Sequence, residues 1–253
     1  MIYIILPIYN EARIVASVVD ELRRILKKKS YCIVAIDDGS TDDTRKILKK
    51  LKHNDLLLIG HAVNMNIGVV FAAGIDKVLK NARDNDAVVI MESDQTSSAD
   101  AIMKLTAPLQ KGIDVVIASR YKPGGGYGNF PLLRHIFSFG ANFLMRLNFP
   151  IDDVWDYTIF FRSYRAGILR KARKVYGKFG LIQSKGFVAN AELLVKLSFL
   201  TKNIVEVPFL YDYGKKTGKS KIGIVKTINE YFVVITYLTD IRKKLAKRMM
   251  INS

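Results

Sequence analysis

The chain has one cysteine, a deficit of acidic residues and no long apolar run. Because Cys32 is the single cysteine among 253 residues, an intramolecular disulfide is excluded and a reducing compartment is expected. No segment reaches the roughly 18 consecutive apolar residues that a membrane-spanning helix needs. The N-terminus begins with a strand-like pattern and without a basic leader, which predicts a cytoplasmic protein.

Acidic residues are too few to balance the basic ones. Forty Lys and Arg stand against 23 Asp and Glu, which gives a formal net charge of +17. Three segments contain several basic residues and no acidic one, at positions 162–178, 214–226 and 241–253. A surplus of this size predicts an anionic partner, such as a phosphorylated substrate, a nucleic acid or an anionic membrane surface.

Short apolar runs alternate with helical patterns over the first 118 residues. Five runs rich in β-branched residues are typical of strands covered on both faces, and they span 2–6, 31–36, 56–60, 87–91 and 114–118. Apolar residues at three-to-four spacing between these runs predict helices. The alternation predicts an α/β fold with a mostly parallel sheet flanked by helices, in which ligands bind beyond the carboxyl ends of the strands.

The pattern changes after residue 120. Four glycines and two prolines within 122–131 predict an irregular, mobile loop. Further helical and strand-like patterns lie at 131–147, 188–200 and 204–214. The last forty residues combine a long helical pattern with an apolar belt and a basic end. We therefore expect one domain over residues 1–225 and a C-terminal basic amphipathic helix over residues 226–253.

Two carboxylates follow directly after the fourth predicted strand. Glu92 and Asp94 are spaced so that both can face one point beyond the end of that strand. Asn10 and Glu11 follow the first predicted strand and Asp38 follows the second, so these groups share one edge of the sheet. A divalent cation takes hard oxygen ligands and bridges phosphate oxygens, so the pair suits a metal ion that holds a diphosphate.

Several segments, in this order, resemble motifs of the family 2 glycosyltransferases of the GT-A fold, nearest the branch of the dolichol-phosphate mannose synthases. The segments are LPIYNEAR (6–13), IDDGSTDDT (36–44), NMNIGVVFAAG (64–74), MESDQTS (91–97), SRYKPGGG (119–126), DYTIFFRSY (156–164) and GKSKIG (218–223). The resemblance covers roughly residues 1–225. It implies a GT-A, Rossmann-like fold and a nucleotide-sugar donor.

The resemblance also implies which residues form the site. Asp38 would hydrogen-bond the base and Ile36 would flank it. Residues implied to contact the nucleotide are Pro7, Tyr9, Asn10, Glu11, Ile36, Asp38 and Ser93. Glu92, Asp94 and Thr96 would hold Mg²⁺ or Mn²⁺ against the diphosphate. Positive charge for the phosphates is implied at Arg120, Lys185, Lys215 and Lys221, and a contact with the acceptor phosphate at Arg134. Asp94, Arg120 and Arg134 are the expected catalytic residues.

The implied reaction is an inverting, metal-dependent transfer of mannose or glucose from a nucleotide sugar to a polyprenyl or dolichyl phosphate. GDP-mannose is the favoured donor and UDP-glucose the second. The chain departs from the family pattern, with Glu92 where Asp is usual, Thr96 where Gln is usual and Lys215 where Arg is usual. These departures affect the expected sugar and the expected metal geometry more than the expected class of reaction.

Two other functions fit parts of the sequence. A transferase of the same fold with a hydroxyl acceptor would need a carboxylate base, for which the candidates are Asp152, Asp153, Asp156 and Glu192. A basic α/β protein that binds nucleic acid would use the net charge of +17. The sequence contains no recognised nucleic-acid motif and no aromatic base-stacking platform, so we expect no nucleic-acid partner.

Two apolar stretches predict where the protein meets a lipid acceptor. Residues 130–147 and the belt YFVVITYL at 231–238 can present apolar area to a membrane surface, and neighbouring Lys and Arg can meet anionic lipid. We expect peripheral association with the cytoplasmic membrane face that is lost on deletion of residues 226–253. Alternatively, these stretches pack in the core or contact a membrane protein or a second copy of the chain.

Overall fold

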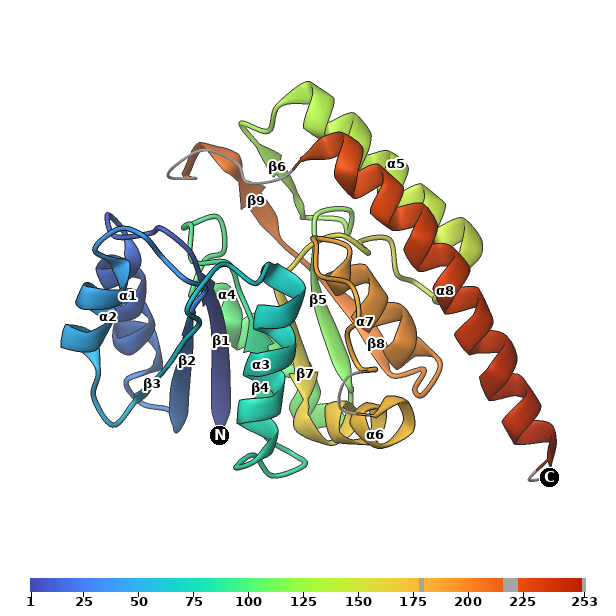
Figure 1. The fold of residues 1–253 in the computed structure, drawn as a ribbon, viewed down its shortest axis with the longest axis horizontal. Helices are drawn as coiled ribbons and strands as arrows, with labels where there is room; N and C mark the ends of the chain where they lie inside the picture. Colours follow the sequence, from blue (N-terminus) through green and yellow to red (C-terminus); the bar gives the residue numbers. More distant parts are fainter. Residues whose placement is uncertain (178–179, 216–222, 252–253) are drawn as a thin grey trace.

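A seven-stranded sheet forms the centre of the molecule (Figure 1). The computed structural model describes residues 1–177, 180–215 and 223–251. The strands of this sheet follow the order β3-β2-β1-β4-β7-β5-β8. They are β1 (Ile2–Ile8), β2 (Tyr31–Asp37), β3 (Leu56–Gly60), β4 (Ala87–Ile90), β5 (Val115–Ser119), β7 (Arg162–Arg165) and β8 (Ile204–Pro208).

The sheet is mostly parallel, as the alternation of patterns predicts. β1 pairs in parallel with β2 and with β4, and β5 pairs in parallel with β8. β7 alone in this sheet runs antiparallel, between β4 and β5. The apolar runs are buried because helices cover both faces; Ile4 and Val89, for example, are fully buried.

Helices cover the sheet on both sides, and α3 crosses in front of it in Figure 1 while α4 lies behind. The helices that follow the strands are α1 (Val15–Leu26), α2 (Thr44–Leu51), α3 (Ile67–Leu79), α4 (Ala101–Thr106), α6 (Ala166–Tyr176) and α7 (Ala189–Ser198), with 3-10 turns η1 (Pro108–Lys111) and η2 (Tyr213–Lys215). In α1 the apolar stripe of Val15, Val18 and Leu22 is buried, which is why this segment forms a helix against the sheet.

The glycine-rich segment contains a strand, contrary to the prediction of an irregular loop. β6 (Gly126–Gly128) pairs in parallel with β9 (Leu210–Asp212) to form a small second sheet. β9 exists because the predicted strand at 204–214 breaks after Pro208, where the Phe209 N–H donates to the Ser119 carbonyl oxygen at 2.9 Å. A Cβ atom on Gly125 would lie 2.4 Å from that same carbonyl oxygen, so the turn before β6 requires glycine.

Two long helices, α5 (Leu132–Asn148) and α8 (Ile224–Ile251), lie side by side at one side of the molecule (Figure 1). The predicted border after residue 225 falls in the first turn of α8. α8 buries Tyr231, Val234 and Leu238 in the core, whereas Phe232 and Val233 are exposed. The apolar belt of the C-terminal helix therefore divides between the core and the surface.

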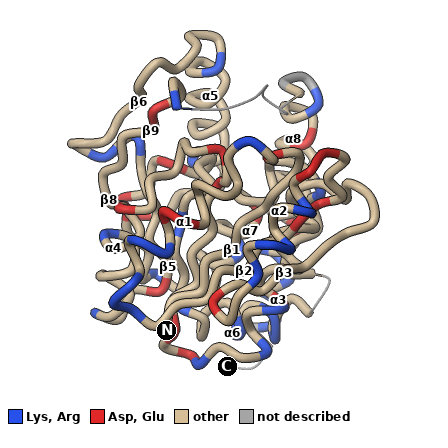
Figure 2. The backbone as a smooth tube through the Cα atoms, turned by 90° about the vertical axis from the view of Figure 1, so that its left-hand side faces the viewer, with Lys and Arg blue, Asp and Glu red and all other residues tan. Residues whose placement is uncertain are grey.

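The outer face of α5 is apolar and exposed, as predicted for residues 130–147. Its large exposed side chains are Leu132, Leu133, Phe139, Phe143 and Leu147, whereas Ile136, which is also exposed, lines the pocket. Arg134 and Arg146 are the charged residues of this helix, and its backbone in Figure 2 is correspondingly almost free of charged positions. Exposed apolar faces of this kind are typical of interaction surfaces.

Candidate functional site

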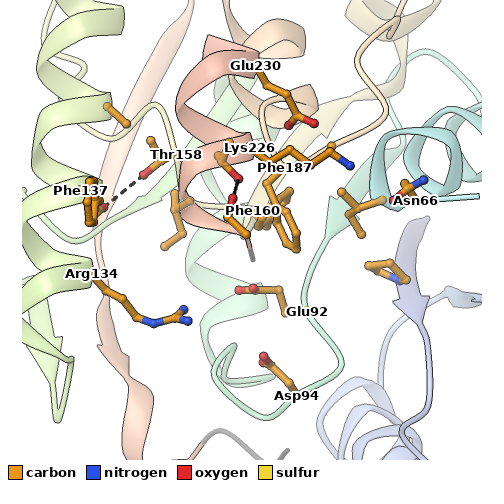
Figure 3. A pocket seen from close by; sticks show the side chains of 18 of the residues that line it. Asn66, Glu92, Asp94, Arg134, Phe137, Thr158, Phe160, Phe187, Lys226 and Glu230 are labelled. Carbon is orange, nitrogen blue, oxygen red and sulfur yellow. Dashed lines mark hydrogen bonds between the residues drawn. The ribbon is translucent and has the colours of Figure 1, made fainter. Parts of the chain in front are cut away.

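A pocket of about 840 Å³ begins at the carboxyl ends of β1 and β4 and continues to α5 and α8 (Figure 3). We call its two parts the strand end and the helix end. The strand end is lined by Pro7, Ile8, Tyr9, Glu11, Asp38, Glu92, Ser93 and Asp94. The helix end is lined by Arg134, Phe137, Ala141, Leu144, Lys226, Glu230, Tyr231 and Phe232. The site therefore lies where a parallel sheet places its ligands.

The loop after β1 presents Tyr9 and Glu11 to the strand end of the pocket. Asn10 has a φ of 53°, in the left-handed region that asparagine tolerates. Its side-chain oxygen accepts the Thr41 N–H at 2.8 Å, and its own N–H donates to the Ser40 hydroxyl at 2.9 Å. Asn10 thus fixes the loop after β1 to the loop after β2, and it does not itself line the pocket.

Asp38, after β2, organises the start of α3. Its carboxylate accepts the N–H groups of Met65 at 2.9 Å and Asn66 at 3.1 Å, and its Oδ1 lies 2.7 Å from the His61 ring nitrogen. Asp38 lines the pocket as predicted, whereas Ile36 is fully buried, packs against α3 and does not line it. The predicted contact of Ile36 with a base is therefore not supported by its position.

The paired carboxylates lie together at the strand end. In Figure 3, Glu92 and Asp94 point to the same side of the pocket. The Thr96 hydroxyl donates to Asp94 and lies 3.4 Å from the Glu92 carboxylate, and the Thr96 N–H donates to Asp94 at 3.2 Å. The Ser93 hydroxyl donates to the Pro7 carbonyl oxygen at 2.8 Å, which ties this turn to β1. The turn thus holds both carboxylates in a fixed direction.

The oxygen atoms of this pair fit a divalent cation that shares its ligands with a phosphate. Among the described residues, no third His, Cys, Asp or Glu completes a metal-binding group with them. Mg²⁺ characteristically keeps one or two carboxylates and takes its remaining ligands from water and phosphate. Burial, followed by the charges of Glu92 and Asp94, raises the pKa of Tyr211, so this hydroxyl stays neutral beside them. The hydroxyl of Thr96, the third predicted metal ligand, contacts both carboxylates.

Arg120 belongs to a buried network. Its guanidinium donates to both carboxylate oxygens of Asp156, at 2.7 and 2.6 Å, and to the Thr158 hydroxyl at 2.6 Å. Burial lowers the pKa of Arg120, but the charge and hydrogen bonds of Asp156 outweigh it and raise the pKa above its ordinary value. The rings of Tyr127 and Tyr211 lie 5.0 and 5.8 Å from its charge centre. Arg120 lines the pocket, with its charge balanced by Asp156.

Arg134 and Lys226 bring positive charge to the helix end. In Figure 3 the Arg134 guanidinium points from α5 toward Glu92 and Asp94. It lies 5.5 Å from the centre of the Tyr213 ring. Within the described part of the chain, neither Arg134 nor Lys226 forms a salt bridge. Both residues therefore add positive charge to the lining of the pocket.

Of the three remaining predicted lysines, the structure describes Lys185 and Lys215, and neither lines the pocket. Lys185 is exposed, and its neighbours Gly186 and Phe187 line the pocket. Lys215 is exposed in η2 and does not line it. Lys221 lies outside the described residues.

Lys226, Glu230 and the aromatic wall of the helix end were not predicted from the sequence. Lys226 and Glu230 are four residues apart on α8, which places both on the face toward the pocket. This spacing was the available signal, but it does not reveal which face of α8 meets the pocket. The aromatic residues of the wall are Phe130, Phe137, Phe160, Phe187, Tyr211, Tyr213, Tyr231 and Phe232.

Curated relatives resemble almost the whole chain. It is 27% identical over 230 residues to the dolichol-phosphate mannosyltransferase of Pyrococcus furiosus. That alignment covers 90% of this chain and 60% of the relative. It is also 27% identical to the polyprenol monophosphomannose synthase of Mycolicibacterium smegmatis, with 87% of this chain and 80% of the relative covered. The chain thus spans less than two thirds of the Pyrococcus protein.

A solved structure supports the fold. The glucosyl-3-phosphoglycerate synthase of Mycobacterium tuberculosis, in complex with Mn²⁺, uridine diphosphate and phosphoglyceric acid, superposes with a TM-score of 0.63 at 16% identity. The match covers 94% of this chain and 76% of that chain. The family model described as glycosyl transferase family 2 matches residues 3–173, well over half of the chain. The chain therefore belongs to glycosyl transferase family 2.

Proposed function

We propose that this glycosyltransferase moves a hexose from a nucleotide sugar to a polyprenyl phosphate, with inversion at the anomeric carbon and with a divalent metal ion. The observation that carries the proposal is the continuity of one pocket. It is acidic at the strand end, and at the helix end apolar side chains surround the charged residues Arg134, Lys226 and Glu230. The names of the Pyrococcus and Mycolicibacterium relatives, which specify dolichol phosphate and polyprenol, support the same acceptor class.

The strand end suits the donor. Tyr9, Glu11 and Asp38 line the space for the nucleotide, and Glu92 and Asp94 hold Mg²⁺ or Mn²⁺ at its diphosphate. When bound, the ion stabilises the negative charge that develops on the leaving diphosphate. Lys185, whose neighbours Gly186 and Phe187 line the pocket, would add positive charge for the phosphates. The roles of Lys215 and Lys221 at the phosphates stay predictions from the sequence. Arg120 lines the pocket, and its guanidinium is bound by Asp156 and Thr158.

Mannose from GDP-mannose is the favoured donor group, because both relatives are named as enzymes of mannose transfer. UDP-glucose is the second candidate. It is favoured by the structural neighbour, which is a glucosyl synthase solved with uridine diphosphate.

The helix end suits a lipid phosphate. Arg134 and Lys226 bind the phosphate, and the apolar side chains of α5 and α8 cover the first part of the isoprenoid chain. A phosphate oxygen is already anionic at neutral pH, so the attacking atom needs no strong general base.

A hydroxyl acceptor is less well supported. Of the four acids proposed as its base, none lines the pocket. Asp156 and Glu192 are fully buried in ion pairs with Arg120 and Lys196, so neither can take up a proton from an acceptor in the pocket. Asp152 and Asp153 follow the end of α5, away from the pocket-lining residues of that helix.

The test is transfer of radiolabel to an organic-extractable product. The purified chain is incubated with labelled GDP-mannose or UDP-glucose, a short polyprenyl phosphate and Mn²⁺. The matched control replaces the polyprenyl phosphate by the polyprenol, which lacks the anionic oxygen. We expect lipid-soluble label with the phosphate only. Label that stays water-soluble with every acceptor, or appears equally with the polyprenol, would contradict the proposed acceptor.

Peripheral contact with an anionic membrane follows from the same acceptor. In the described part of the chain, no helix is long and apolar enough to span a bilayer. The exposed apolar face of α5 supplies the surface that enters the headgroup boundary, and the basic residues of α8 from Arg242 onward meet anionic lipid. Deletion of residues 226–253 is a poor test of this contact, because it also removes Tyr231, Val234 and Leu238 from the core.

A further inference from the structure

Residues 183–187 end at the pocket and connect it to three helices. Gly186 and Phe187 line the pocket. The carbonyl oxygen of Lys185 accepts the N–H of Gly68 at 2.9 Å, which joins the segment to the first turn of α3. α7 begins just after the segment, and α8 packs against α7.

A buried ion pair on α7 holds the beginning of this segment. Glu192 and Lys196 are one helical turn apart, fully buried and directly paired. The Glu192 carboxylate accepts the N–H groups of Gln183 at 2.9 Å and Ser184 at 2.8 Å. The Lys196 ammonium donates to the Gly180 carbonyl oxygen at 2.7 Å. Buried charges need such partners, so the pair fixes the backbone of the segment as it satisfies its own hydrogen bonds.

The same ion pair is bonded to α8. The Lys196 ammonium donates to the Tyr237 hydroxyl at 2.9 Å and lies 4.7 Å from the centre of the Tyr237 ring. Burial and the charge of Glu192 raise the pKa of Tyr237 to about 12, so the hydroxyl is neutral and accepts through its oxygen. α8 also reaches the segment directly, since a Cβ atom on Gly186 would lie 2.1 Å from the Glu230 carboxylate.

We propose that Glu192, Lys196 and Tyr237 form a positioning unit, through which α8 holds residues 183–187, and with them Lys185, at the donor diphosphate. None of the three touches the pocket, so their role is to place the segment and not to contact the substrate. The inference rests on the proposed function, because it requires a nucleoside diphosphate at the strand end. It assigns to the C-terminal helix a part in donor binding that is separate from any membrane contact.

The test is Tyr237→Phe, which removes the hydroxyl and keeps the half-buried ring. Dissociation constants are measured for GDP and GMP, and in parallel for UDP and UMP, with Mn²⁺ present. We expect the diphosphate to bind roughly fivefold more weakly and the monophosphate almost unchanged, because one hydrogen bond to a charged group is lost and the proposal assigns Lys185 to the outer phosphate. A general loosening of the fold would weaken both nucleotides alike.

A double-variant cycle identifies the residue through which the unit acts. In a Lys185→Gln background, Tyr237→Phe should have no further effect on diphosphate binding, since the group that it positions is already absent. An undiminished effect of Tyr237→Phe in that background would overturn the assignment to Lys185.

Tyr176→Phe is the matched control. Its hydroxyl donates to the Lys196 backbone carbonyl at 2.8 Å, in the same buried region, and makes no hydrogen bond to the ammonium or to residues 183–187 in the described structure. It should leave diphosphate binding unchanged. Amide hydrogen exchange in residues 183–187 should accelerate in Tyr237→Phe only.

The outcomes separate this inference from the proposed function. Unaltered exchange and binding in Tyr237→Phe would overturn the inference alone. Failure of the wild-type chain to bind either diphosphate would overturn the proposed donor and this inference with it.

Discussion

At the strand end of the pocket, Asp38, Ser93 and Asp94 bond to backbone groups of the loop after β3, of β1 and of the turn after β4, respectively. At the helix end, Arg134 and Lys226 project from two separate helices. The strand end is polar and fixed by short loops. The helix end is apolar, and its shape depends on how α5 and α8 pack. Under the proposed function, the sheet edge carries the donor chemistry and the helices select the acceptor, so variants at the two ends should fail in different ways.

The largest effect is expected at the carboxylate pair. Asp94→Asn should lower turnover about a thousandfold, because metal stabilisation of the leaving group contributes several kcal/mol and each ~1.4 kcal/mol is a factor of ten. Glu92→Gln should cost less, because Thr96 holds Asp94 with two hydrogen bonds and lies 3.4 Å from Glu92. Initial rates and Mn²⁺ titration of nucleotide binding measure both effects.

Asp43→Asn is the control for this pair, since it changes an exposed carboxylate after β2, whose salt bridge joins it to Lys46 at 3.9 Å, to the same amide. It should leave turnover and the Mn²⁺ response unchanged. Full activity of Asp94→Asn would exclude a metal role and leave the two carboxylates with a structural role in the turn.

The second effect concerns the buried ion pair of Arg120 and Asp156. Asp156→Asn should reduce the free energy of unfolding by about 3 kcal/mol, because it leaves the buried Arg120 charge without its partner. Burial alone would raise the pKa of Asp156, but the Arg120 charge and hydrogen bonds outweigh it and hold the pKa below its ordinary value. The stabilisation is therefore present above pH ~4 and is lost as the pH falls through the folded pKa.

Urea unfolding at several pH values between neutrality and acid checks this prediction. The wild-type chain should lose stability more steeply in acid than Asp156→Asn. Parallel curves for the two proteins would mean that the ion pair does not contribute through its charge.

At the helix end the failure should be one of acceptor binding. Arg134→Gln should raise the KM for polyprenyl phosphate by about tenfold or more, since a hydrogen bond to a charged group contributes roughly 1.5–3 kcal/mol. The KM for the nucleotide sugar should stay the same. Arg146→Gln is the matched control, because Arg146 lies on the same helix but stacks on Trp155 outside the pocket. A rise in the donor KM instead would break the division between the two ends.

The strand end could be predicted largely from sequence because its determinants are local. A buried parallel strand fixes where its last residue lies, so Glu11, Asp38 and Asp94 could be assigned to one sheet edge from the strand pattern alone. Ile36 is the exception: it pairs in register with Pro7, yet its side chain packs against α3. A motif match does not show which face of a strand a side chain occupies.

The helix end could not be predicted to the same degree because its contacts are distant in sequence. Arg120 could be read as a phosphate ligand, since its partner Asp156 is 36 residues away and nothing local joins them. Lys226 was visible only as part of a basic segment, because its place in the pocket depends on the packing of α8. The strand β6 was missed for the same reason, since its partner β9 lies far along the chain.

The smallest expected effect tests whether the helix end faces a membrane. Phe139 and Phe143 lie on the exposed face of α5, 59% and 61% accessible, and are absent from the pocket lining. Phe139→Gln and Phe143→Gln should each weaken sedimentation with anionic liposomes by about fivefold, because each removes an apolar group contributing roughly 1 kcal/mol at the headgroup boundary. Val63→Gln is the control, since it changes an equally exposed apolar side chain in the loop before α3.

Added salt should weaken sedimentation of wild type and variants alike, because salt screens the basic residues of α8 and leaves the apolar contact of α5 intact. Transfer to a water-dispersed short acceptor should be unchanged, since neither phenylalanine lines the pocket. If the variants sediment like wild type but alter the oligomeric state in size-exclusion chromatography, the face of α5 binds a second copy of the chain. In that case the helix end would still select the lipid phosphate, and the membrane would be met by another surface.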